Sequence, residues 1–403
     1  MHIVFDISVL RIAQAGVLSY TRSLLDALIR VGAEHRFTLL DVLPLNPGLP
    51  LEPLAAFGAP NVRLARLPGL RRGYISQLPG LRDGRLHAMA DPLDRALDGA
   101  WGAASVGAMA LALRRALRGA DVFHGSDQLS SLRGAPNVLT IQDLSTLLHP
   151  EWHVADNAAM HAAKERAARS AAQIIVPSHA VRHEVIAHLG IAPERVTAIA
   201  YAADTRFRPY SAVEIAPIVA RYGLVPQGYL LCVNTIEPRK NHIGLLEAYA
   251  RLCASRPDTP PLVLAGGVGW KAEPILTAPA QLGIANRVRF LGKVPDADLP
   301  ALLAGAALFV YPSLYEGFGL PLLEALASGV PAVASGVSSM PEVMGDAGVA
   351  VDPLSPASIA DGMRRILDNT ALAADLRTRG VQRAATFSWE RAAREVLGVY
   401  ARA

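Results

Sequence analysis

Cysteine is scarce in this chain of 403 residues, which holds only Cys232 and Cys253. The two form no CxxC pair and cannot build a disulfide framework, so we expect a reduced protein of the cytoplasm. Long apolar runs are also missing, because uncharged stretches such as residues 99–113 and 299–315 are shorter than the ~20 residues that span a bilayer. The first residues, MHIVFDISVL, lack the basic and apolar regions of a signal peptide. We therefore expect a cytoplasmic chain that does not cross a membrane.

Charge is low and unevenly placed. Charged residues make up 18% of the chain and hydrophobic residues 51%, a balance typical of a globular protein. The formal net charge is +4, yet residues 63–118 alone carry +6. The arginines of this Arg-rich segment are Arg63, Arg66, Arg71, Arg72, Arg82, Arg85, Arg95, Arg114, Arg115 and Arg118. With leucines and Tyr74 between them, they favour either a peripheral contact with anionic lipid at the inner face of the membrane or a solvated basic face. No recognised nucleic-acid-binding module is present, so we expect no nucleic-acid partner.

Apolar strand-like runs alternate with helical patterns along the whole chain, which predicts an α/β protein with doubly wound parallel sheets. The expected strands are residues 2–7, 37–42, 62–67, 121–124, 138–141, 173–176, 196–200, 229–233, 262–265, 288–291, 308–311 and 331–334. A connector with prolines and glycines, residues 204–228, separates two segments of similar pattern. We expect two Rossmann-like domains, one over residues 1–208 and one over residues 209–385, which face a central cleft. Residues 386–403 are expected to form a helix that packs back on the N-terminal domain.

The stretch YPSLYEGFGLPLLEALASGVP, residues 311–331, follows an expected buried strand. Pro321 near the start of a helix and Gly329 after its end are typical start and stop signals. The unpaired N–H groups at such a helix N-terminus form an anion site, and the glycines of the loop allow close approach to the backbone. Two carboxylates, Glu316 and Glu324, flank that site. Carboxylates beside an anion site favour a ligand with both hydroxyls and phosphate, a nucleotide sugar, whereas the simpler alternative is a glycine turn before an ordinary helix.

A second stretch, EPRKN at residues 237–241, places Arg239 and Lys240 between an expected strand and a helix that opens at Asn241. Basic residues at a helix N-terminus oppose the macrodipole, so we expect an anion to compensate them, and a diphosphate would serve. A solvated basic pair in a loop is the alternative.

Together these stretches resemble glycosyltransferase family 4. Residues 316–324 read as its Glu-x7-Glu signature, EPRKN is its companion element, and the resemblance extends through YTRSLLDAL, DVFHG, DLSTLLHPEWH, PSHAVRHEV, AGGVGW and VRFLGKVPDADLPALL. Members of this family are retaining enzymes of the GT-B fold. The resemblance implies that the N-terminal domain, residues 1–208, binds the acceptor and that the C-terminal domain, residues 209–385, binds the nucleotide sugar. The motifs are specific for the family and not for a substrate.

The resemblance implies a role for each matching residue. Lys240 and Arg239 would hold the donor diphosphate, Glu316 would bind the transferred sugar, and Glu324 would bind the ribose hydroxyls. Catalytic positions would also include Asp143 and Gln142. Further donor contacts are implied at Gly16, in a loop that would close over the diphosphate, and at the positions Phe318, Gly319, Leu320, Gly266 and Val294. Preorganised cations and amides would stabilise the charge on the departing phosphate.

Two departures from the family pattern bear on activity. Members commonly have His-Asp where this chain has Gln142-Asp143, and glutamine keeps a hydrogen bond but not the basicity of histidine. The Gly16 loop has Leu18 and Ser19 where a second glycine and an arginine are usual. The alternative function is therefore a nucleotide-sugar-binding partner subunit without activity.

No metal is expected. Asp296 and Asp298 spell DxD, a metal–diphosphate motif of another glycosyltransferase fold, but they precede an apolar helix, where aspartate is an ordinary N-cap residue. No histidines show metal-ligand spacing, and His124 and His149 are as well explained as structural side chains. We expect no cofactor, because a nucleotide sugar is a co-substrate.

The sequence thus predicts a metal-independent, retaining glycosyltransferase of the cytoplasm. It would move a hexose, with mannose favoured by the EPRKN form, from a GDP- or UDP-sugar to a glycan or polyprenyl-linked acceptor in cell-surface polysaccharide biosynthesis.

Overall fold

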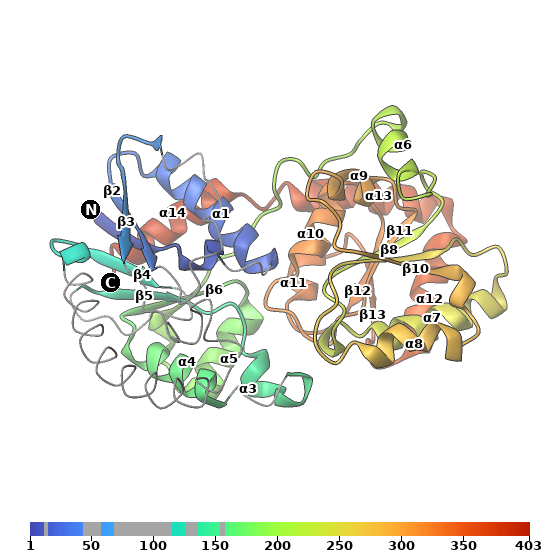
Figure 1. Ribbon diagram of the computed structural model, residues 1–403, viewed down its shortest axis with the longest axis horizontal. Helices are drawn as coiled ribbons and strands as arrows, with labels where there is room; N and C mark the ends of the chain where they lie inside the picture. Colours follow the sequence, from blue (N-terminus) through green and yellow to red (C-terminus); the bar gives the residue numbers. More distant parts are fainter. Residues whose placement is uncertain (12–14, 43–57, 68–114, 126–134, 154–157) are drawn as a thin grey trace, which may run out of the picture. The chain divides into compact units, whose positions relative to one another are not determined.

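The structure is a computed structural model that describes residues 1–11, 15–42, 58–67, 115–125, 135–153 and 158–403 (Figure 1). The chain divides into two compact units. Unit 1 comprises Met1–Thr140, Lys164–Ile175 and Ala393–Ala403, and unit 2 comprises Ile141–Ala163 and Val176–Ala392. Most of the Arg-rich segment lies outside the described residues, so its expected membrane contact remains a prediction.

The N-terminal sheet has seven strands in the order β3-β2-β1-β4-β5-β6-β7. Their bounds are β1 (His2–Asp6), β2 (Arg36–Val42), β3 (Val62–Leu67), β4 (Val122–Gly125), β5 (Asn137–Thr140), β6 (Gln173–Val176) and β7 (Val196–Ala198). The pairs β1–β2, β1–β4, β2–β3, β4–β5 and β5–β6 are all parallel. The helices in this part of the chain are η1 (Ser8–Arg11), α1 (Ala15–Val31), α3 (Ser145–Leu148), η3 (Pro150–Trp152), α4 (Ala158–Ser170), α5 (His179–Leu189) and η5 (Pro193–Arg195).

The C-terminal sheet has six parallel strands in the order β10-β9-β8-β11-β12-β13. They are β8 (Leu230–Val233), β9 (Leu262–Ala265), β10 (Val288–Gly292), β11 (Leu308–Tyr311), β12 (Ala332–Ser335) and β13 (Val349–Val351). Helices α7 (His242–Ser255), α8 (Glu273–Gln281) and α12 (Pro356–Leu367) lie on one face, and α9 (Leu299–Ala304), α10 (Leu320–Ala327) and α13 (Thr370–Ala384) lie on the other (Figure 1). The remaining elements are α6 (Ala212–Ala220), η6 (Pro238–Lys240), η7 (Ala285–Arg287), α11 (Met340–Met344) and α14 (Trp389–Tyr400).

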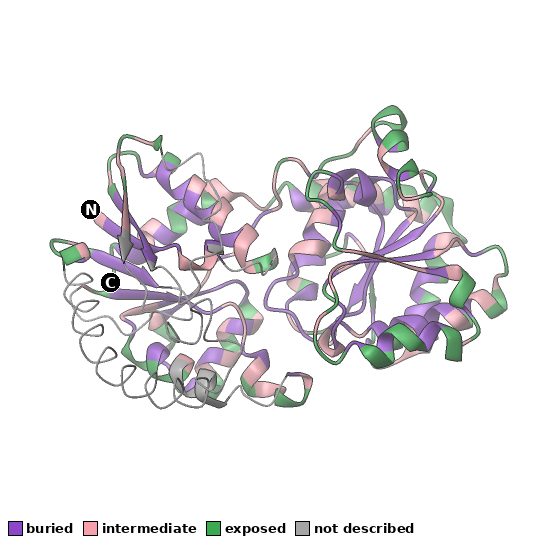
Figure 2. Ribbon diagram, in the orientation of Figure 1, coloured by how far each residue is buried: buried purple, intermediate pink, exposed green. Residues whose placement is uncertain are grey.

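Burial on both faces explains why these strands are short continuous apolar runs. The segments LLCV, LVLA, LFVY and AVAS form β8, β9, β11 and β12, and their interiors are buried, as Figure 2 shows. Their side chains join the inward faces of α7 and α12 in one core cluster, with Leu230, Leu264, Val310 and Met363 all at most 1% exposed. Parallel sheets covered by helices on both sides show this pattern, so the predicted doubly wound α/β architecture is confirmed.

The chain order reverses at β8 in the C-terminal sheet. From β8 the chain moves to β9 on one side, and β11 pairs with β8 on the other. Loops that leave the C-terminal ends of two such neighbouring strands diverge to opposite faces and leave room for a ligand. The EPRKN loop follows β8 and the Glu316 loop follows β11, so both motifs lie at this switch point.

Several element predictions were wrong or incomplete. The expected loop at Gly16 is instead the first turn of α1, which begins at Ala15. Strand β13 was not predicted, because its three residues VAV are too few for a periodic signal. Among the helices that were not predicted, α6 and α8 each contain an internal proline, which is an ordinary helix-breaking signal.

None of the helices in the described ranges is both long and apolar enough to cross a membrane.

Candidate active site

The candidate site is built by the two loops that leave β8 and β11. Their backbones are joined where the Leu314 amide donates to the Arg239 carbonyl at 2.9 Å. This bond holds η6, which carries Arg239 and Lys240, against the loop that carries Glu316. The two sequence motifs, 76 residues apart, are therefore neighbours in space.

Lys240 and Glu316 form a buried ion pair at the centre of the site. Lys240 is 8% exposed and Glu316 is 6% exposed. The Lys240 Nζ lies 2.7 Å from Oε1 and 2.9 Å from Oε2 of Glu316, so one ammonium bridges both carboxylate oxygens. A buried charge is tolerated only when it is paired and hydrogen-bonded, and each of these two groups supplies that pairing to the other.

Arg239 adds a second cation with three carboxylates around it. Its Nη1 lies 3.2 Å from Glu316 Oε2, and its Nη2 lies 3.2 Å from Glu237 Oε1. Asp143, in the same unit, is more distant, with its Oδ2 3.7 Å from Arg239 Nη1. Glu237, which received no role from the sequence, is therefore part of the charge network.

The pKa of Glu316 reflects two opposing effects. Burial alone would raise the pKa of Glu316, but the charges of Lys240 and Arg239 and the hydrogen bonds from Lys240 and Tyr311 outweigh burial and lower it. Burial and the charge of Arg239 lower the pKa of Lys240, and Glu316 opposes them. The pair is an ionised carboxylate that fixes the direction of an ammonium group.

The compensating anion expected for Arg239 and Lys240 is present within the chain. The sequence argument offered a diphosphate as that anion, whereas the structure supplies Glu316, Glu237 and Asp143. The basic pair therefore does not by itself demand a phosphate, and a diphosphate contact here stays a prediction.

Asn241 has a structural role at the end of the same motif. Its backbone adopts φ +58°, in the left-handed region that asparagine tolerates, between η6 and α7. Its side-chain Nδ2 donates to the carbonyl oxygens of Pro312 and Pro353 at 3.0 and 2.6 Å. The helix begins at His242, and Asn241 ties the loops after β8, β11 and β13 together instead of capping it through its side chain.

Hydroxyl groups from a later loop hold the backbone of the Glu316 loop. Ser338 Oγ and Ser339 Oγ donate to the Glu316 carbonyl at 2.7 and 2.9 Å, and Ser339 Oγ also lies 2.9 Å from the Phe318 carbonyl. No sequence signal linked these serines to a motif more than 20 residues earlier. The loop then presents the amides of Gly319 and Leu320, because Pro321 has no N–H and the Leu322 and Leu323 amides donate to the Gly319 carbonyl.

Gly319 and Gly317 are glycine for different structural reasons, the first for its backbone conformation and the second for lack of space. Gly319 has φ +99°, a conformation that side chains rarely adopt, and it occupies the N-cap position of α10. At Gly317 a Cβ atom would lie 2.0 Å from the Gln142 carbonyl oxygen, so this glycine makes room for the chain itself. The expectation that both glycines serve the approach of a ligand was wrong for Gly317. Phe318 is buried against Tyr201, with ring centroids 5.0 Å apart.

Glu324 lies on α10 in an environment unlike that of Glu316. Burial raises the pKa of Glu324 to about 7, with Asp204 and Asp296 adding to the rise and Arg206 opposing it. The two carboxylates of one signature therefore differ in charge near neutral pH, since Glu316 is ionised while Glu324 is partly protonated.

Gln142 and Asp143 follow β5 and make local bonds. The Tyr201 hydroxyl donates to Gln142 Oε1 at 2.7 Å, which leaves the amide NH2 of Gln142 as the group free to donate. Asp143 Oδ1 accepts from the amide and the hydroxyl of Ser145 at 3.0 and 2.8 Å.

Gly266, Val294 and Gly16 remain predicted donor contacts. Gly266 has φ +154° at the end of β9, and a Cβ atom there would lie 1.8 Å from the Asn234 carbonyl oxygen, so the fold itself requires glycine. Val294 is buried in the loop after β10. Gly16 is exposed in the first turn of α1, with open space around it, and it belongs to unit 1.

The DxD pair is explained by the fold. Asp298 is buried, and its carboxylate accepts from Arg221 at 2.7 Å and from the Tyr222 hydroxyl at 2.6 Å. It occupies the N-cap position of α9 but makes no side-chain cap bond, so the expected capping role was wrong in that detail. Within the part of the chain that the structure describes, no group of three or more His, Cys, Asp and Glu side chains could hold a metal ion.

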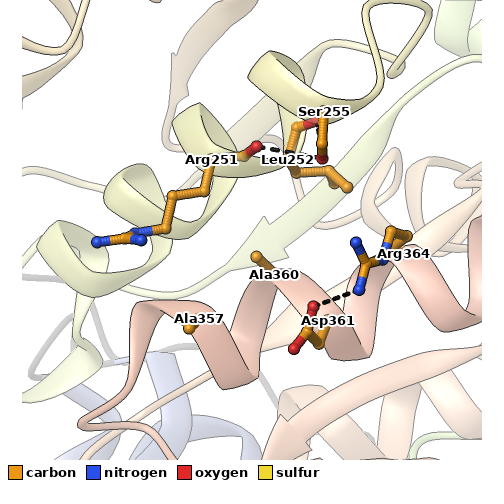
Figure 3. A pocket seen from close by; sticks show the side chains of 7 residues that line it. All are labelled: Arg251, Leu252, Ser255, Ala357, Ala360, Asp361 and Arg364. Carbon is orange, nitrogen blue, oxygen red and sulfur yellow. Dashed lines mark hydrogen bonds and ion pairs between the residues drawn. The ribbon is translucent and has the colours of Figure 1, made fainter.

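A separate hollow of about 190 Å³ lies between α7 and α12 (Figure 3). Arg251 of α7 is among its lining residues, and Asp361 pairs with Arg364 at 2.7 Å on α12. It is at the C-terminal end of α7, whereas Lys240 lies just before the first turn of that helix. The hollow is therefore separate from the candidate site.

The site's chemistry can be read from its groups. Two cations and the amides of Gly319 and Leu320, where α10 begins, suit an anion of high charge density. Glu324 can accept hydrogen bonds from hydroxyls, and Glu316 can do so when one of its present donors withdraws. The groups of this site therefore suit a ligand that carries both phosphate and hydroxyl groups.

Comparisons with known proteins identify the family. Residues 15–207 match the profile described as Glycosyltransferase Family 4, and residues 222–383 match that of Glycosyl transferases group 1. The chain is 36% identical over 280 residues to the O-antigen chain mannosyltransferase B of Escherichia coli, covering 69% of this chain and 74% of that one. The chain belongs to the family of glycosyltransferases with the GT-B fold, as the motifs indicated.

Two further similar proteins match different shares of this chain. The serotype-specific mannosyltransferase WbdA of Escherichia coli is 35% identical over 224 residues, which are 54% of this chain but 27% of that much longer protein. The solved structure of sucrose-phosphate synthase from Thermosynechococcus elongatus superposes with a TM-score of 0.73 at 20% identity, covering 100% of this chain and 98% of that one. At 20% identity, the similarity to sucrose-phosphate synthase shows the fold alone.

Proposed function

We propose that this protein is a retaining hexosyltransferase that moves mannose from GDP-mannose to a glycan or polyprenyl-linked acceptor during assembly of a cell-surface polysaccharide. The carrying observation is the buried bridge from Lys240 to both oxygens of Glu316, beside the amides of α10. Support for mannose and for the pathway class comes from the O-antigen chain mannosyltransferase, which shares 36% identity. UDP-sugars are the alternative donors.

In this proposal the donor diphosphate lies against Lys240, Arg239 and the N-terminus of α10. The bond between the sugar C1 and the leaving phosphate oxygen breaks, and a bond from C1 to the acceptor oxygen forms on the same face. The acceptor proton passes to the departing phosphate oxygen, so the anomeric configuration is retained. Preorganised cations stabilise the charge that develops on the leaving group, and no bound metal takes part.

Glu316 then holds a hydroxyl of the transferred sugar, and Glu324 holds the ribose. Gln142 offers its amide NH2 to the sugar, in place of the imidazole that is usual in the family. The protein works in the cytoplasm, and the Arg-rich segment brings it to the inner membrane surface. Sedimentation with anionic vesicles tests that contact, and undiminished binding after charge reversal of Arg71 and Arg72 would remove it.

A thermal-shift panel tests the donor. A ligand that binds only the folded state stabilises it by about 2.7 kcal/mol at 100 times its dissociation constant, which corresponds to several degrees in Tm. We expect GDP and GDP-mannose to raise Tm and UDP, UDP-glucose and mannose 1-phosphate to do so less. Equal shifts for GDP and UDP would overturn the choice of base, and no shift with any nucleotide sugar would overturn the site.

A further inference from the structure

We propose that Tyr311 is a positioning residue for the transfer reaction, one that holds the Glu316 carboxylate in place while the neighbouring cations engage the donor diphosphate. This inference rests on the proposed function of the site. Tyr311 is the last residue of β11, and the family motif assigns it no role.

Tyr311 meets Glu316 in a fixed geometry. Its hydroxyl donates to Glu316 Oε1 at 2.7 Å, and the residue is 1% exposed. Its backbone is paired with Ala334 in β12, and its ring stacks on Phe309 with centroids 5.7 Å apart. The phenol therefore comes from the rigid sheet, unlike the flexible side chain of Lys240.

The carboxylate of Glu316 already accepts as many hydrogen bonds as it can. Its Oε1 receives Lys240 and Tyr311, and its Oε2 receives Lys240 and Arg239. A carboxylate offers about four lone-pair positions, so a sugar hydroxyl can bind only when one of these donors withdraws.

The identity of the donors decides which one withdraws. A diphosphate attracts the two cations, and Lys240 Nζ has three N–H bonds that it can redirect. Tyr311 is neutral, because burial and the Glu316 charge raise its pKa well above the ordinary value. A neutral phenol is attracted to a phosphate less strongly than a cation is, so its bond to Oε1 stays and holds the carboxylate in place while Lys240 is shared with the donor.

The other charged and titratable groups that face this carboxylate come from two places. Arg239 and Lys240 come from η6, and the Cys232 thiol comes from the neighbouring strand β8. Burial raises the pKa of Cys232 to about 12, so the thiol stays neutral and does not compete as an anion.

The test replaces the hydroxyl and keeps the ring. Tyr311→Phe is compared with Tyr229→Phe, the matched control, because Tyr229 is also fully buried and its hydroxyl donates to the Leu302 carbonyl at 2.6 Å. Both variants lose one buried phenol bond, and only Tyr311 touches Glu316. Folding is checked by Tm, and binding by calorimetric titration with GDP and UDP.

We expect Tyr311→Phe to lose roughly 10- to 100-fold in kcat, the range of one hydrogen bond to a charged group, while its affinity for the nucleoside diphosphate stays within about 3-fold of the wild type. We also expect the acid limb of its pH–rate profile to move to higher pH, because the ionised form of Glu316 loses a donor. Tyr229→Phe is expected to keep both kcat and the profile.

Two results would overturn the inference about Tyr311. A titration of Glu316, followed by 13C NMR, that is unchanged in Tyr311→Phe would overturn the inference even if turnover were low, and so would equal kcat losses in the two variants. Wild-type protein that turns over no GDP- or UDP-sugar would instead overturn the proposed function, and with it the catalytic meaning of Tyr311.

Discussion

Glu316 and Glu324 belong to one short signature, yet the fold places them in opposite electrostatic surroundings. Glu316 has two cations and a phenol within hydrogen-bond distance, and its pKa falls. Glu324 is half-buried near Asp204 and Asp296, and its pKa rises to about 7. A carboxylate that is partly protonated near neutral pH can both donate to and accept from ribose hydroxyls, whereas Glu316 only accepts.

Glu324 makes stability dependent on pH in a defined direction. The pKa of Glu324 in the folded state lies above its ordinary value of 4.5. Its contribution to the free energy of unfolding is therefore fully present below about pH 4.5 and is lost as pH rises through about 7. Glu324→Gln removes this dependence. We expect the Tm of the variant, relative to the wild type, to rise by at least about 2 °C between pH 5 and pH 8.

Glu273→Gln is the control for this comparison, because it removes one carboxylate from an exposed position in the first turn of α8. If the difference in Tm between Glu324→Gln and the wild type stayed constant from pH 5 to pH 8, the raised pKa of Glu324 would be contradicted.

A site residue could be predicted from the sequence when it belongs to a short motif, and not when tertiary packing alone brings it to the site. Arg239, Lys240, Glu316 and Glu324 were found because motif and spacing carry them. Tyr311 lay inside the quoted stretch without a role, since a tyrosine at the end of a strand is usually core. Ser338 and Ser339 could not be found, because their bonds to the Glu316 loop arise from the packing of two loops distant in sequence.

At the scale of elements, helix α14 is tied to the N-terminal sheet by a buried chain of hydrogen bonds within unit 1. The Tyr400 hydroxyl lies 2.5 Å from Nδ1 of His124 on β4, and Nε2 of His124 lies 2.7 Å from Thr140 Oγ1 on β5. Tyr20 of α1 joins the same oxygen at 3.1 Å. Burial lowers the pKa of His124 to about 3, so the ring is neutral and supplies one donor and one acceptor. His124 is thus a structural histidine.

Tyr400→Phe tests this network. The change leaves a buried ring nitrogen of His124 without its partner, which costs about 1–3 kcal/mol of unfolding free energy in urea titration. Tyr210→Phe is the control, since the Tyr210 hydroxyl donates to the Arg206 carbonyl from a partly buried position where water can replace it. If Tyr400→Phe lowered the unfolding free energy no more than Tyr210→Phe does, the packing of α14 would not depend on the network.

The success of element prediction followed the strength of each periodic signal. Twelve strands of the two sheets coincide with expected apolar runs, whereas the three-residue β13 gave too little pattern to recognise. Helices α6 and α8 carry Pro217 and Pro279 in their last turns, where tertiary packing overrides the unfavourable propensity. Gly16 was expected in a loop because glycine is typical of turns, whereas it lies in the first turn of α1.

For the whole molecule, the doubly wound architecture explains where the chemistry lies. Two motifs 76 residues apart meet because β8 and β11 are parallel neighbours at the point where strand order reverses. Family membership follows from the motifs and from the matched profiles. The base, the sugar and the acceptor do not follow, because they depend on pocket shape and on contacts that no short motif encodes.

The central claim is that the Lys240–Glu316 site transfers a hexose from a nucleotide sugar, and release of nucleoside diphosphate from GDP-mannose measures it most directly. We expect slow release by the wild type with water as acceptor and faster release with a lipid-linked glycan, and we expect Glu316→Gln to lower both by roughly 100-fold or more while the protein stays folded. If the wild type released no nucleoside diphosphate from any GDP- or UDP-sugar, or if Glu316→Gln released it as fast as the wild type, the claim would be contradicted.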